Sequence, residues 1–253
     1  AGFGARTLKS NYKSAKYINS PESIIYNKSK ILYGLYNSKN EIVKRDNCYI
    51  VEGYTDVLRF HQKDIKNVVS SSGTAMSTDQ INLIRRLTKN ITMLYDSDKA
   101  GINATVRSID MILEQNMNVN IVLFPESEDP DSFAKNKNTE EIKTYLHDNA
   151  TDFIEFKAKS LNNSSRNSTV EKAQVVNDIV SSISKIPDRI KQEIYIKQCS
   201  DMLEITENTL FNALAQLNQI TKVNRNISRT KTEIDIPKKI LFIYKITYST
   251  MSF

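Results

Sequence analysis

The sequence predicts an α/β fold, in which a parallel sheet with flanking helices is followed by a smaller all-helical subdomain. Three observations lead to this prediction. Between residues 48 and 124, short β-branched runs alternate with amphipathic stretches of helical length. Each run stops at a polar, acidic or glycine-containing turn, and helical periodicity alone continues from there to about residue 220. Parallel neighbours in a sheet need a crossover connection, which a helix supplies.

The individual elements follow from their residue patterns. Strands are expected at the runs 48–51, 67–69, 91–95 and 119–124. Helices are expected at 55–62, 78–87 and 100–115. The second of these begins with a capping box, because Ser77 precedes Gln80 by three residues, and it places Ile81, Ile84 and Leu87 on one face.

The chain changes character after residue 124. An acidic loop is expected at 125–132, then helices, with no further strand before the tail. Apolar residues recur there at helical spacing, which predicts two core-facing stripes. The first stripe is Val170, Ala173, Val176, Val180 and Ile183, and the second is Leu210, Leu214 and Leu217.

Charge is distributed unevenly along the 253 residues, whose net charge is +6. Residues 1–45 hold nine Lys and Arg against two acids, whereas residues 46–150 hold eleven against sixteen. A basic arm therefore precedes an acidic core. We expect four parts, with boundaries at 1–45, 46–150, 151–221 and 222–253, the last being a linker or tail.

Cysteine and histidine usage excludes some classes of site. The two cysteines and two histidines show no zinc-ligand or disulfide-framework spacing, so we expect no zinc in this chain. We also expect a cytoplasmic protein without membrane contact, because no apolar run reaches the roughly 18 residues of a spanning helix.

Carboxylates follow three of the expected strands. They are Glu52, Asp56, Asp96, Asp98, Asp129 and Asp131. Parallel strands end at one edge of a sheet, where open α/β folds bind ligands, so these acids are expected to converge. Such a cluster repels itself unless a cation sits among the oxygens, and Mg²⁺ is the first candidate. Each acid alone could equally be a helix N-cap, and it is the conjunction of three acidic strand exits that favours a metal site.

The motifs that carry these acids resemble a known domain. The sequences VEGYTDV (51–57), YDSDKAG (95–101) and EDPD (128–131) are similar to the TOPRIM domain of bacterial replicative DNA primases. Topoisomerases and some nucleases share that domain. The upstream segments GFGAR (2–6), and those at 16–22 and 28–35, resemble the primase polymerase core directly before it.

The resemblance implies a DNA primase, which joins ribonucleoside triphosphates into short RNA primers on a single-stranded DNA template and works with the replicative helicase in the primosome. By the same resemblance, Glu52, Asp96 and Asp98 are catalytic and hold Mg²⁺, for which Mn²⁺ can substitute. Asp56, Asp129 and Asp131 are second-rank ligands or orienting groups.

The resemblance further implies that four residues line the nucleic-acid and nucleotide side: Arg6, Lys16, Tyr17 and Lys28. We expect the chain to be a fragment of a longer protein that primes poorly by itself. Two alternatives stay open. The same acids could serve a TOPRIM-type nuclease or topoisomerase-related enzyme, or the chain could be a non-catalytic nucleic-acid-binding fragment whose acids only cap helices.

Overall fold

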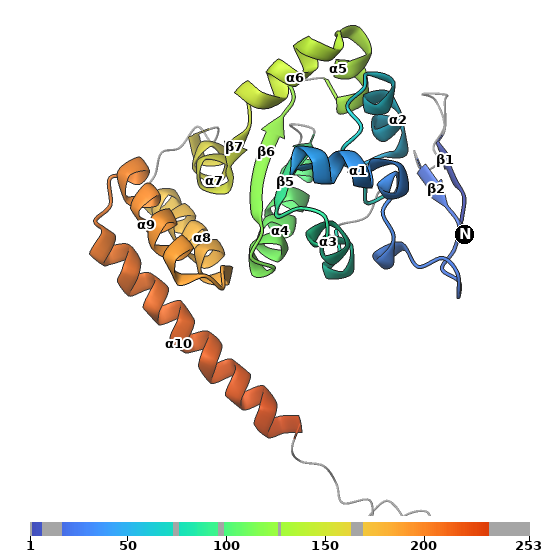
Figure 1. The fold of residues 1–253 in the computed structure, drawn as a ribbon. Helices are drawn as coiled ribbons and strands as arrows, with labels where there is room; N and C mark the ends of the chain where they lie inside the picture. Colours follow the sequence, from blue (N-terminus) through green and yellow to red (C-terminus); the bar gives the residue numbers. More distant parts are fainter. Residues whose placement is uncertain are drawn as a thin grey trace, which may run out of the picture.

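The molecule is built around one five-stranded sheet with helices on both faces (Figure 1). This computed structural model describes residues 2–6, 17–72, 76–95, 99–125, 128–162 and 169–232. The strand order is β4-β3-β5-β6-β7. The strands are β3 (Cys48–Val51), β4 (Val68–Ser70), β5 (Asn90–Tyr95), β6 (Asn118–Leu123) and β7 (Thr151–Asp152). The first four in spatial order are parallel, which confirms the predicted α/β class.

The crossover helices lie where the periodicity predicts them. They are α2 (Tyr54–Gln62), α3 (Thr78–Arg85) and α4 (Lys99–Glu114). The capping box of α3 is confirmed, because the Ser77 hydroxyl accepts the Gln80 N–H at 3.1 Å and the Gln80 side chain accepts the Ser77 N–H at 3.0 Å. The sequence pattern and the backbone hydrogen bonding therefore agree on where α3 begins.

Two expectations for the segment after residue 124 are wrong. The acidic loop ends earlier than expected, since α5 (Pro130–Asn136) begins inside it and α6 (Thr139–Asp148) follows. A further strand, β7, then pairs antiparallel with β6 through Asn120–Asp152 and Ile121–Thr151. A two-residue strand is too short to show the alternation by which strands are recognised in a sequence.

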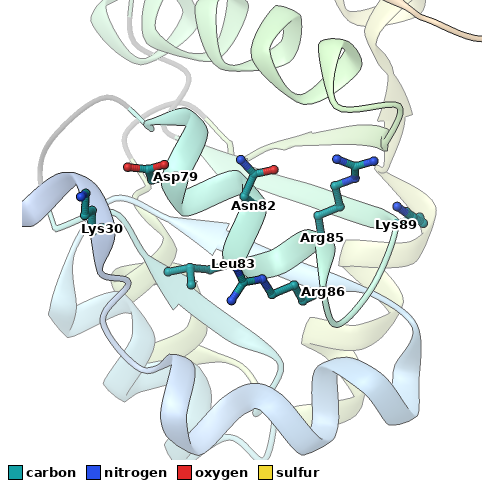
Figure 2. A pocket seen from close by; sticks show the side chains of 7 residues that line it. All are labelled: Lys30, Asp79, Asn82, Leu83, Arg85, Arg86 and Lys89. Carbon is teal, nitrogen blue, oxygen red and sulfur yellow. The ribbon is translucent and has the colours of Figure 1, made fainter.

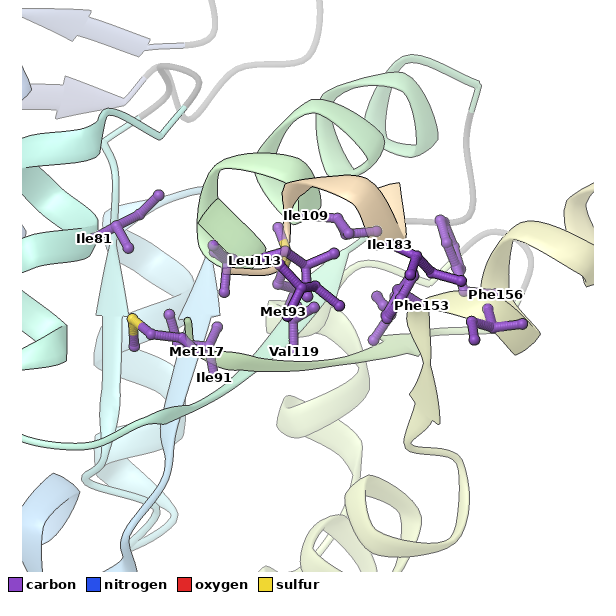
Figure 3. Close-up of a cluster of buried hydrophobic side chains, with 14 of the residues drawn as sticks. Ile81, Ile91, Met93, Ile109, Leu113, Met117, Val119, Phe153, Phe156 and Ile183 are labelled. Carbon is purple, nitrogen blue, oxygen red and sulfur yellow. The ribbon is translucent and has the colours of Figure 1, made fainter. Parts of the chain in front are cut away.

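Apolar side chains alternate between the two faces of the sheet. Along β5, Ile91 and Met93 point to one core while Leu94 points to the other, as the pleat of a strand requires. The first core lies under α3, α4 and the later helices, and Figure 3 shows its centre. The second core lies under α2, α5 and α6. Both faces of the sheet are therefore covered, and only its edges are free to hold a site.

The later helices are α7 (Phe153–Asn162), α8 (Thr169–Lys185), α9 (Arg189–Leu203) and α10 (Glu207–Thr232). Their buried residues join the first core rather than forming a separate one, and α10 then leads away from the body (Figure 1). The second expected stripe is confirmed at Leu210 and Leu214. The first is confirmed at Val180 and Ile183, which are buried, and at Val176, which packs against the core, but not at Val170, which is 75% exposed at the start of α8.

A buried lysine joins the helical part to α4. Lys157 of α7 is 5% exposed, and its ammonium donates to the Ser182 hydroxyl of α8 and lies 3.8 Å from the Asp110 carboxylate of α4. Burial lowers the pKa of Lys157, and the charges of Asp110 and Asp178 partly offset this effect. The predicted domain boundary at residue 150 is thus crossed by both apolar and polar contacts.

The amino-terminal residues form a small separate sheet and a short helical segment. Strands β1 (Gly4–Arg6) and β2 (Tyr17–Asn19) pair antiparallel, and a 3-10 helix, η1 (Lys28–Lys30), precedes α1 (Leu35–Arg45). Gly34 begins α1 at φ +84°, with Val68 of β4 close to where a Cβ would stand, so a larger residue is disfavoured there on both counts. Among the described residues, no helix is both long and apolar enough to cross a bilayer.

Candidate active site

The expected juxtaposition of strand ends is present for the first two acidic exits. Strands β3 and β5 are parallel neighbours, with Ile50 opposite Met93. Glu52 follows Ile50 by two residues, and Tyr95, the last residue of β5, follows Met93 by two residues. The chain leaves β3 and β5 at the same edge of the sheet, side by side. Asp96 and Asp98, which follow Tyr95 directly, lie outside the described residues.

The Glu52 carboxylate exerts its charge on the end of β5. The Tyr95 side chain is 5% exposed, and burial raises the pKa of its hydroxyl. The negative charge of Glu52 raises it further, while a hydrogen bond with Ser108 of α4 lowers it. An acid that perturbs Tyr95 in this way lies near the point where the chain continues to Asp96. Glu52 itself is exposed, as an open site requires.

The backbone around Glu52 is held by its neighbours. The Glu52 carbonyl accepts the Ser70 hydroxyl at 2.7 Å, which ties the end of β3 to the end of β4. Gly53 then begins α2, and its N–H donates to the Asp56 carboxylate at 2.9 Å. Asp56 is 7% exposed and closes the first turn of α2. Asp56 therefore stabilises the turn that follows Glu52, and its role toward a metal or substrate stays a prediction.

Asp129 and Asp131 are placed at the start of α5. Asp129 caps that helix, with its carboxylate accepting the Ser132 N–H at 2.8 Å. Asp131 accepts a hydrogen bond from Arg59 of α2 at 2.8 Å, and both side chains are partly buried. The two acids therefore have structural contacts that join α5 to α2. Their role toward a metal stays a prediction.

The basic arm docks beside the start of α2. Arg6 of β1 is the register partner of Tyr17 of β2. Two of the predicted nucleic-acid residues therefore lie opposite each other on adjacent strands. The Tyr54 hydroxyl of α2 donates to the Asn19 side chain, and a Cβ on Gly4 would overlap the Tyr54 ring. The small β1–β2 sheet is thereby held against the residue two positions after Glu52. The side chains of Arg6 and Tyr17, and all of Lys16, lie outside what the structure describes.

Lys28 occupies a different place. It begins η1, where its N–H donates to the Glu22 carboxylate at 3.0 Å and its carbonyl accepts the Gln80 amide of α3 at 2.9 Å. The Lys28 side chain is half-buried. Lys28 is thus fixed to α3, whereas the β1–β2 sheet contacts α2 through Gly4 and Asn19.

No group of three or more His, Cys, Asp or Glu residues with the geometry of a metal site occurs within the described part of the chain. Of the three acids predicted as metal ligands, the structure describes Glu52 alone. Its exposed carboxylate fits the oxygen ligands that Mg²⁺ prefers, and two acids follow in sequence at the adjacent strand end. The described residues are thus compatible with a magnesium site whose other ligands come from 96–98.

Sequence reasoning missed the contacts that hold this edge together. Nothing in the spacing of Asn19, Tyr54 and Ser70 pairs them with residues far away in the chain. The Arg59–Asp131 pair joins two residues 72 positions apart, and their opposite charges alone do not single them out as partners. The shared edge of the strand ends, in contrast, was predicted, because parallel strands have their carboxyl ends at one edge of a sheet.

Comparisons with known proteins agree with this arrangement. Residues 49–134 match the family model described as Toprim-like. Residues 1–39 match the N-terminal domain of the DNA primase catalytic core, and residues 163–208 match the DnaB-helicase binding domain of primase. A DNA primase of Clostridium acetobutylicum is 36% identical over 234 residues, which cover 89% of this chain. The chain belongs to the DNA primase family.

Solved primase structures share the fold. A DNA primase domain from Pseudomonas aeruginosa superposes with a TM-score of 0.72 at 28% identity, covering 85% of this chain and 67% of that one. A DnaG primase catalytic domain bound to single-stranded DNA superposes with a TM-score of 0.70 at 28% identity, covering 82% of this chain and 66% of that one. The family resemblance inferred from the three acidic motifs is therefore confirmed.

The chain is shorter than its primase relatives. It spans 38% of the length of the C. acetobutylicum primase and 42% of a primase from Halalkalibacterium halodurans. The helicase-binding match falls on α8 and α9, and the sequence analysis had assigned no helicase segment to those helices. TOPRIM primases are in general metal-dependent, which agrees with the type of site expected here.

Proposed function

We propose that this chain contributes the polymerase centre of a DNA primase, which joins ribonucleoside triphosphates into an RNA primer on single-stranded DNA. The observation that carries the proposal is the adjacency of the β3 and β5 ends, with the exposed Glu52 directly after β3. That adjacency is what a site shared between Glu52 and the acids at 96 and 98 needs. Membership of the primase family supports the choice of reaction.

In this proposal Glu52, Asp96 and Asp98 hold Mg²⁺, or Mn²⁺ in its place. The bound metal lowers the pKa of the attacking 3′ hydroxyl and offsets charge on the triphosphate. Asp56 fixes the turn that carries Glu52 through its hydrogen bond with the Gly53 N–H. Asp129 and Asp131 set the position of α5 beside α2 and serve as orienting groups or second-rank ligands.

The basic arm supplies the nucleic-acid side in this proposal. Arg6, Lys16, Tyr17 and Lys28 contact template and nucleotide in this proposal, and a structural relative bound to single-stranded DNA supports a DNA ligand in general. Lysine and arginine neutralise phosphates without reading sequence, so the arm positions the strand rather than selecting it. The match at 163–208 supports a replicative helicase as a partner that binds α8 and α9.

The reaction class is tested on the longer protein that contains this chain. We expect template-directed incorporation of ribonucleotides into RNA with single-stranded DNA, ribonucleoside triphosphates and Mg²⁺, and no nicking of supercoiled DNA under the same conditions. Nicking without incorporation would instead assign the site to a TOPRIM-type nuclease or topoisomerase. Binding of DNA with neither activity would leave a non-catalytic binding protein.

A further inference from the structure

A surface hollow lies along α3 and extends to Lys30 of η1 at one end and to Lys89 at the other. It has a volume of about 540 Å³, and Figure 2 shows the side chains that line it. Four of these are cations: Lys30, Arg85, Arg86 and Lys89. Asp79, in the first turn of α3, is the one carboxylate among the lining residues. The surface is thus strongly positive, although residues 46–150 hold eleven Lys and Arg against sixteen acids.

The four cations are available for a ligand. All four side chains are exposed, and within the described part of the chain none of them forms an ion pair with a carboxylate. Arg85 has only a long hydrogen bond of 3.4 Å to the neutral amide of Gln115. Their positive charge is therefore not cancelled by neighbouring acids, and a bound anion would supply the missing countercharge.

The cations come from separate segments instead of converging on one point: Lys30 is in η1, Arg85 and Arg86 are at the end of α3, and Lys89 lies four residues beyond that helix. Figure 2 shows Lys30 and Lys89 at opposite ends of the hollow, with Arg85 and Arg86 on different sides of the helix. The phosphates of a single nucleotide need cations gathered around one small group. A row of separated cations fits the repeating phosphates of a strand.

The row begins where the predicted nucleic-acid side ends. Lys30 is in η1 together with Lys28, and η1 is anchored to α3 because the Gln80 amide donates to the carbonyls of Lys28 and Ile31 at 2.9 and 2.8 Å. Since α3 connects the parallel strands β4 and β5, it runs back across the sheet, and its last turn lies at the opposite sheet edge from Glu52. A single strand of nucleic acid that contacts Lys28 could therefore continue along α3.

We propose that this row of cations binds the sugar–phosphate backbone of single-stranded nucleic acid, as an extension of the template path beyond the catalytic edge. The proposal rests on the proposed function for the identity of its ligand. Because the contacts are to phosphates, we expect binding that is independent of sequence and strongly dependent on salt.

The test is a binding measurement without nucleotides or metal, so that it is independent of catalysis. The probe is a labelled DNA single strand of about 30 nucleotides, which is longer than the stretch that one single-strand binding site usually covers. The variant is Arg85→Ser, Arg86→Ser and Lys89→Ser combined. We expect Kd to weaken about tenfold, and the slope of log K against log salt to fall by about 2, because each phosphate contact on a single strand contributes about 0.7.

Two further variants make the result specific. A charge-matched control removes three exposed cations from α8 and α9, through Lys172→Ser, Arg189→Ser and Lys197→Ser, and should leave the slope and affinity unchanged. Arg85→Lys with Arg86→Lys keeps the charge and should retain binding. Equal affinity and slope for the α3 variant and the unaltered chain would overturn the proposal, and so would equal loss in the lysine variant.

The outcome is separable from that of the proposed function. Intact DNA binding without ribonucleotide incorporation would contradict the proposed reaction and leave the α3 strand site standing. ATP binding could also be lost in the α3 variant, by as much as DNA binding. That result would indicate a mononucleotide site and contradict the proposed site for single-stranded nucleic acid.

Discussion

Replacing Glu52 with glutamine is expected to reduce template-directed ribonucleotide incorporation by at least about 100-fold, because the amide oxygen carries no charge for the metal or for the developing negative charge of the transition state. Single-stranded DNA binding should stay within about twofold, since the arm and the α3 row are unchanged. The side chain is exposed, so the substitution should not affect folding. The measurement is primer synthesis by the longer protein, with binding followed in parallel.

Glu193→Gln is the matched control for this substitution. Glu193 is an exposed glutamate on α9, away from the carboxyl edge of the sheet, and its loss should leave incorporation unchanged. Unaltered incorporation in the Glu52 variant would remove Glu52 from the mechanism. An equal loss in both variants would show that general charge, and not the position at the end of β3, is responsible.

Replacing Phe153 with alanine should cost about 3–5 kcal/mol in the free energy of unfolding, the usual range for a fully buried phenylalanine. Phe153 has no exposed surface, begins α7 directly after β7, and contacts the Tyr195 ring of α9 with centroids 4.9 Å apart. It therefore links the sheet to the later helices inside the first core. Urea unfolding followed by far-ultraviolet circular dichroism measures the loss.

The Phe153 variant also tests whether sheet and helices unfold together. Because they share one core, we expect one transition that moves to lower urea as a whole. Val170→Ala, at a side chain 75% exposed, should change the free energy of unfolding by less than about 0.5 kcal/mol. Two separate unfolding transitions, of which only the one at higher urea shifts in the Phe153 variant, would mean that the helices form an independent unit.

The order of the regular elements was predictable because each carries its own local signal. The Ser77–Gln80 capping box and the apolar face of α3 are contained within a dozen residues, and the structure confirms both. Strand β7 and the exposed Val170 were not predictable on the same basis. The first is two residues long, and the second has the spacing of a core residue but lies at the exposed start of α8.

The site was predictable in position more than in detail. Parallel topology alone brings the ends of β3 and β5 together, and the structure has them adjacent. The partners of the remaining acids depended on tertiary contacts that no spacing encodes, such as Arg59 for Asp131 and the helix cap made by Asp129. The cations at 85, 86 and 89 carry no spacing that marks a site, and only the fold brings Lys30 beside them.

The most direct measurement of a shared metal site is a calorimetric titration of the chain with Mn²⁺. The expected result is a binding heat that is lost in Glu52→Gln and equally lost in Asp96→Asn, because the two acids come from neighbouring strand ends and hold one ion. Glu193→Gln should retain the full heat. Undiminished Mn²⁺ binding in both acid variants, or no binding by the unaltered chain, would contradict a metal site at this edge of the sheet.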